Sequence, residues 1–179
     1  MKKTFILIIA VLVSCQKTEN RKNTESITVE KKVDNTEKAK KWLVETIEKN
    51  LNKDFYNMSD FTTKDYAEYK QDATNVDLYA EGSLTENEFK NKWKNKFDVR
   101  FAGIGNGFLI SAQDNGKIKV ISCVPLKSDN QNEYNFKTII RDIDFKTEDK
   151  RDIKVIENKS SFLISDVKEY DKNTAGNSG

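Results

Sequence analysis

The chain has 179 residues, the length of one ordinary domain. Its 31 basic and 29 acidic side chains give a net charge of +2, which argues against a nucleic-acid-binding protein. The lack of histidine excludes histidine-dependent catalytic triads and most zinc sites, and two cysteines are too few for a disulfide scaffold. Aromatic residues make up 10% of the chain, enough to fill a hydrophobic core, so a folded domain is expected.

The first fifteen residues have the layout of a secretory signal. Lys2 and Lys3 precede an apolar run, residues 5–13, that is too short to cross a bilayer. The sequence Leu12-Val13-Ser14-Cys15 resembles the lipobox of bacterial lipoproteins, and Gln16-Lys17-Thr18-Glu19 resembles the lysine-plus-acid export signals of the Bacteroidetes type. The resemblance implies cleavage before Cys15, lipidation of Cys15 with a palmitate-type anchor, and attachment to the cell envelope, in the first place the outer membrane. The alternative is that Cys15 is an ordinary cysteine behind a signal that is cleaved elsewhere.

Composition divides the chain into four segments. Residues 1–14 are expected to be the signal peptide, and residues 15–35 the lipidated cysteine and a flexible tether. The tether has few large apolar residues and cannot bury enough surface to offset its ordering entropy. Residues 36–170 are expected to form a single domain, and residues 171–179 a disordered tail. Whether the domain faces the periplasm or the cell surface stays open.

Three helices are expected in the first half of the domain. Asp34 and Glu37 have capping-box spacing, and apolar residues follow at helical intervals: Ala39, Trp42, Leu43, Ile47 and Leu51. A second helix is expected after Thr62-Thr63, with Tyr66, Tyr69, Ala73 and Val76 on one face. In the third, Thr85 and Glu88 form a capping box, Leu84 and Phe89 a hydrophobic staple, and Phe89, Trp93 and Phe97 one face.

Strands are expected after residue 98. The dipeptide Asn115-Gly116 favours a type I′ hairpin turn between residues 108–113 and 117–124. Further strands are expected at residues 134–145, 153–156 and 162–167, and a change of phase within 134–145 indicates a β-bulge. Glycines 103, 105 and 107 indicate a bend. The fold class is therefore α+β, with N-terminal helices packed on a curved, cone-like antiparallel sheet of four to five strands.

This arrangement resembles the nuclear transport factor 2-like superfamily. The segment Phe162-Leu163-Ile164-Ser165-Asp166-Val167 is similar to the last strand of that fold. The resemblance implies a cone-shaped fold. If the protein were an enzyme of this type, a small-molecule substrate would bind inside the cone. Many members use histidine or an Asp/Tyr arrangement there, and histidine is absent here. A cystatin-like or another α+β fold is the alternative.

Residues 77–88 resemble a degenerate EF-hand calcium loop. Asp77, Glu81, the Ser83 carbonyl and Glu88 occupy ligand positions, and Gly82 occupies the turn position. The position that normally carries Asp or Asn holds Tyr79, a poor calcium ligand. The alternative needs no metal, because the capping box already explains Thr85 and Glu88.

The remaining candidates are weaker. Asp142 and Asp144 are expected to share one face of a strand, and paired carboxylates can carry out acid-base chemistry, but acids on a solvent-facing surface are commoner. Cys123 is expected in the core. Tyr66, Tyr69 and Tyr79 either rim a ligand pocket or belong to the core. The sequence predicts a membrane-anchored, non-enzymatic domain that binds an unknown protein or small ligand but no nucleic acid. A calcium-binding module is the alternative, and a small-molecule enzyme is the second alternative.

Overall fold

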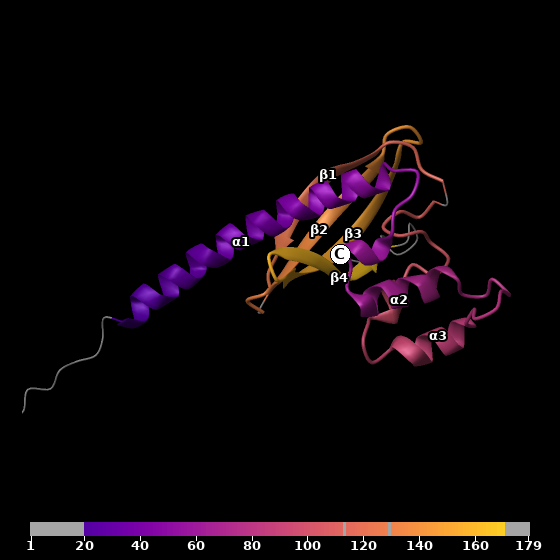
Figure 1. The fold of residues 1–179 in the computed structure, drawn as a ribbon, viewed down its shortest axis with the longest axis horizontal. Coiled ribbons are helices and arrows are strands. Elements are labelled where there is room, and N and C mark those ends of the chain that lie inside the picture. Colours follow the sequence, from indigo (N-terminus) through magenta and orange to yellow (C-terminus); the bar gives the residue numbers. More distant parts are fainter. Residues whose placement is uncertain (1–19, 113, 129, 171–179) are drawn as a thin grey trace, which may run out of the picture.

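A computed structural model describes residues 20–112, 114–128 and 130–170. Three α-helices come first, joined by two short 3₁₀ turns, and four strands follow. The elements are α1 (Asn20–Leu51), η1 (Met58–Asp60), α2 (Lys64–Thr74), α3 (Glu86–Trp93), η2 (Val99–Phe101), β1 (Ile118–Leu126), β2 (Glu133–Asp142), β3 (Thr147–Asn158) and β4 (Ser161–Glu169). Consecutive strands pair antiparallel in the order β1-β2-β3-β4 (Figure 1). The expected α+β class and strand number are confirmed.

The first helix is longer than expected. α1 begins at Asn20, so the predicted start at Asp34 is wrong, and residues 20–35 are helical where a flexible tether was expected. Asp34 pairs with Lys38 one turn further on instead of capping the helix. Residues 20–51 contain no glycine or proline, so nothing in the backbone chemistry stops the helix. Packing and helix formation are separate questions, so low apolar content did not exclude a helix here.

Only the second half of α1 packs on the sheet. Ala39, Leu43, Ile47 and Leu51 are buried, and the helix lies chiefly against β1. The first half projects beyond the sheet, away from the end of the molecule that holds α2 and α3 (Figure 1). None of the helices in the described ranges is long and apolar enough to span a bilayer.

The core lies between the helices and one face of the sheet, here called the inner face. Its strand residues are Ile118, Cys123, Tyr134, Phe136, Ile140, Ile153, Val155, Ile164 and Val167. The expected caps are confirmed: Thr63 caps α2, and Thr85 and Glu88 form the capping box of α3. Aromatic side chains fill the space between α2 and α3, with the rings of Tyr69 and Phe97 stacked at 4.3 Å.

The hairpin predicted around Asn115-Gly116 is wrong. Residues 108–112 and 114–117 form no strand. Instead, the Asn115 amide donates to the Leu51 carbonyl at the end of α1 (3.0 Å), and the Gly116 N–H donates to the Asp142 carboxylate (2.7 Å). These two contacts fasten the loop before β1 to other elements, so the dipeptide serves a tertiary contact instead of a tight turn.

The predicted bulge within residues 134–145 is also wrong, because β2 alternates regularly along its whole length. Ile143 and Phe145, which suggested the change of phase, lie in the turn after β2 and are exposed. The register instead shifts in β1, between Val120 and Ser122. It shifts again between β3 and β4, where Ser165 is the extra residue. A bulge redirects neighbouring side chains, and this second one lies next to the site described below.

Candidate binding site on the outer face of the sheet

The loop that resembles an EF-hand serves the cap of α3. The Glu88 carboxylate accepts hydrogen bonds from the Thr85 N–H (2.9 Å) and hydroxyl (2.7 Å), and these bonds lower the pKa of Glu88. Among the described residues, no three acidic or cysteine side chains are grouped to hold a metal ion. The Glu88 carboxylate is thus engaged in the capping box, and calcium binding by Asp77, Glu81, Ser83 and Glu88 stays a prediction.

The other predicted residues separate into different environments. Cys15 lies outside the described residues. Cys123 is buried, as expected. Tyr66 and Tyr69 are core residues, whereas Tyr79 is 99% exposed, so the three tyrosines do not rim one pocket.

The two acids at the end of β2 are structural. Asp142 is buried, contrary to the solvent-facing expectation, and accepts from the N–H groups of Gly116 (2.7 Å), Asp144 and Phe145 (both 3.0 Å). Asp144 accepts from the Lys117 N–H (2.8 Å). Each carboxylate therefore shapes the β2–β3 turn and the loop beside it. Their backbone contacts give no indication of acid-base chemistry.

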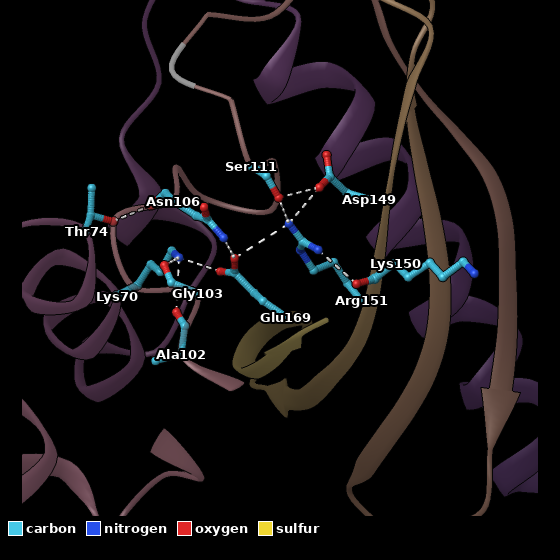
Figure 2. A network of polar contacts seen from close by, with 10 residues as sticks. All are labelled: Lys70, Thr74, Ala102, Gly103, Asn106, Ser111, Asp149, Lys150, Arg151 and Glu169. Carbon is cyan, nitrogen blue, oxygen red and sulfur yellow. Dashed lines mark hydrogen bonds and ion pairs between the residues drawn. The ribbon is translucent and has the colours of Figure 1, made fainter. Parts of the chain in front are cut away.

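Sequence reasoning missed a buried ionic network on the inner side (Figure 2). Its centre is Glu169 at the end of β4, which pairs with Lys70 of α2 and with Arg151 of β3 (3.6 Å). Lys70 also donates to the carbonyls of Ala102 (3.3 Å) and Gly103 (3.2 Å). Lys70, Arg151 and Glu169 are at most 3% exposed, so they join elements and leave no room for a ligand.

The network continues to the surface through Arg151. Its guanidinium donates to the Ser111 hydroxyl and the Asp149 carboxylate, both at 3.0 Å. Asn106 donates to the second oxygen of Glu169 at 3.2 Å. Burial raises the pKa of Glu169, and the two neighbouring cations oppose that rise. Two cations are thus balanced by Glu169 and Asp149, as burial of charge requires.

The opposite face of the sheet, here called the outer face, holds a cavity of about 290 Å³. Its lining comes from the end of β1 and from β2, β3 and β4: Leu126, Lys127, Glu133, Asn135, Asp152, Ile153, Lys154, Asp166 and Lys168. Strand register explains the arrangement. Asp152 lies beside Lys168, and Lys154 beside Asp166, so acids and lysines alternate both along and across the strands. We call this set of four side chains the charge square.

The Asp152 carboxylate is incompletely satisfied. Its Oδ2 accepts from the Tyr170 hydroxyl at 2.7 Å. Its Oδ1 is buried and accepts no hydrogen bond from any described residue. Such an orphaned acceptor costs about 1–3 kcal/mol unless a donor reaches it. Burial and the hydrogen bond to Asp152 raise the pKa of Tyr170 to about 12, so the hydroxyl stays a donor at neutral pH.

Of the other three side chains of the charge square, Asp166, Lys154 and Lys168, the two lysines make longer contacts. Burial raises the pKa of Asp166. Lys154 pairs with Glu133 at 3.6 Å, and the Lys168 ammonium lies 5.5 Å from the centre of the Phe101 ring. Including Lys127 and Glu133, the cavity lining has three lysines and three acids. Its formal charge is therefore zero, which suits a ligand that carries charges of both signs.

The sequence contained a signal for this site. Asp152 and Lys154, and again Asp166 and Lys168, are two residues apart on predicted strands and so share a face. What the sequence did not give was the register that puts the two pairs side by side.

Comparisons with protein-family models, curated proteins and solved structures give no match.

Proposed function

We propose that this protein is a lipid-anchored component of a bacterial cell envelope, attached to the outer membrane, whose domain binds a small ligand without catalysing a reaction. The anchoring part rests on the lipobox-like Leu12-Val13-Ser14-Cys15. The binding part rests on one observation: the cavity of the outer face is lined by a balanced set of charges and holds a carboxylate oxygen without a donor.

The helix α1 supports the anchored arrangement. It begins at Asn20, shortly after Cys15, and runs without interruption into the core at Leu51. Its 32 residues span about 48 Å at 1.5 Å per residue. A helix of this length acts as a stalk: its first half separates the lipid from the domain, and its second half is held by the sheet. Lipid chains at the start of the stalk would bind the membrane without a protein span.

Lipidation is tested by changing Cys15 to Ser in the full chain and labelling bacterial cells with palmitate. We expect the wild type to carry label and to sediment with membranes, and Cys15→Ser to lose both. Cys123→Ser is the matched control, because Cys123 is buried in the core, and it should keep the label. A Cys15→Ser protein that still takes up label and stays with the membranes would refute the anchor.

A further inference from the structure

We infer that the outer-face cavity is a binding site for a small zwitterion of the dipeptide class, with its ammonium group at Asp152 and its carboxylate at Lys154. This inference rests on the proposed binding function and deepens it by naming the ligand class.

The acids of the charge square call for a donor. Asp152 keeps its Oδ1 buried and without a hydrogen bond from the described residues, while Tyr170 occupies Oδ2. Asp166 lies on the neighbouring strand, next to the bulge at Ser165. An ammonium group brings three N–H donors and a positive charge, so one such group supplies the donor that Asp152 lacks.

The lysines require the ligand to carry an anion as well. Lys168 is the direct cross-strand neighbour of Asp152, and Lys154 that of Asp166. A simple cation in the cavity would be repelled by these two ammonium groups and by Lys127 on the rim. A ligand with a carboxylate turns that repulsion into attraction, and the net charge of the cavity stays at zero.

The spacing of the charges selects the length of the ligand. Asp152 and Lys154 are two residues apart on β3, as are Asp166 and Lys168 on β4, which places each acid about 7 Å from a lysine along the strand. The two ends of an extended dipeptide are separated by about 7 Å. Lysine side chains are flexible, so those of the charge square can adjust to a ligand of this length.

The test is calorimetric titration of the full-length protein in detergent with three probes: dialanine, N-acetyl-dialanine, which lacks the ammonium, and dialanine amide, which lacks the carboxylate. We expect saturable binding of dialanine. Both blocked forms should bind with an affinity at least about tenfold lower, because each has lost a charge-assisted contact. Equal binding of a blocked form, or no binding of dialanine, overturns the inference.

Two isosteric variants locate the site. Asp152→Asn keeps an acceptor for Tyr170 but loses the charge, and Lys154→Gln removes one cation; each should weaken dialanine binding about tenfold. Glu81→Gln, an exposed acid in the loop before α3, is the control and should bind as the wild type does. Unchanged affinity in Asp152→Asn, with its circular dichroism spectrum intact, overturns the site. Palmitate labelling of Cys15 in the same preparation shows separately whether the anchor holds.

Discussion

At the scale of single residues, Glu169 has the most demanding environment in the described part of the chain. It is 3% exposed and accepts from Lys70 and Asn106 while it faces Arg151. Gly103 makes this possible: its φ is +59°, and a Cβ there would lie 1.9 Å from a Glu169 oxygen. The carboxylate therefore joins α2, β3, β4 and the glycine-rich loop. If α2 or β4 moved away, the Lys70–Glu169 pair would break and a buried charge would lose its partner.

We accordingly expect Glu169→Gln to destabilise the fold by about 3–5 kcal/mol, because Lys70 would remain buried without a carboxylate and Arg151 would keep only Asp149. Urea unfolding followed by circular dichroism measures the change. Asp65→Asn is the control: the Asp65–Lys96 pair is more than half exposed at both ends and should cost less than about 1 kcal/mol. Similar losses in both variants would show that Glu169 contributes no more than a surface charge.

The sequence predicts that these charged side chains point inward, but not which groups they contact. Lys70 shares the apolar helix face of Tyr66, Tyr69 and Ala73, and Arg151 continues the alternation of Ile153 and Val155. Periodicity alone therefore places both side chains inward. It gives no partners, since these come from segments far apart in the chain, and a charge without a visible partner is normally assigned to the surface. Asp142 was misjudged for the same reason.

At the scale of elements, α1 protects the exposed edge of the sheet. The Glu48 carboxylate accepts from the Val120 N–H (3.0 Å) and the Lys119 ammonium (2.9 Å). One turn further on, the Asn52 amide accepts from the Ile118 N–H (2.8 Å) and donates to the Ile118 carbonyl (2.9 Å). Edge strands with free backbone groups invite pairing with other chains. Two side chains of one helix thus satisfy the first half of β1.

This contact makes stability depend on pH. Burial alone would raise the pKa of Glu48, but the bonds from Lys119 and Val120 outweigh it and hold the pKa below its ordinary value. The stabilisation is thus complete above the unfolded-state pKa of about 4.3 and is lost as pH falls through the lower folded-state value. We expect Glu48→Gln to cost about 1 kcal/mol at neutral pH and progressively less below about pH 4. Urea unfolding across this range measures the difference, and a cost that does not change with pH would contradict this role for the charge.

The elements themselves were predicted unequally well. Caps and staples are local signals, so the starts of α2 and α3 are confirmed at Thr63 and Thr85. The Asn115-Gly116 turn and the bulge were predicted wrongly because contacts with distant segments decide both. Local turn preference at Gly116 is overridden by its bond to Asp142, and the phase of β2 is set by its neighbours β1 and β3.

At the scale of the whole molecule, α1 lies along the sheet, and α2 and α3 lie together at one end of it, where α2 contacts β4 (Figure 1). The hydrophobic pattern was sufficient to predict this α+β layering, because helices precede strands and each strand offers one apolar face. The outer-face cavity was not predicted, since it requires the register of three strands at once. The extent of α1 was not predicted either, and it divides the molecule into a projecting half-helix and a packed body.

That division predicts two different responses to proline in one helix. Val33 is 59% exposed, and from Val33 onward the first buried position of α1 is Ala39. Val33→Pro should therefore reduce the helical circular dichroism signal yet change the free energy of unfolding by no more than about 0.5 kcal/mol. Glu45 is also exposed but lies between the buried Leu43 and Ile47, so Glu45→Pro breaks the packed half and should cost about 3 kcal/mol or more. Equal losses in the two variants would show that the projecting half belongs to the folding unit, and α1 would then not be a stalk.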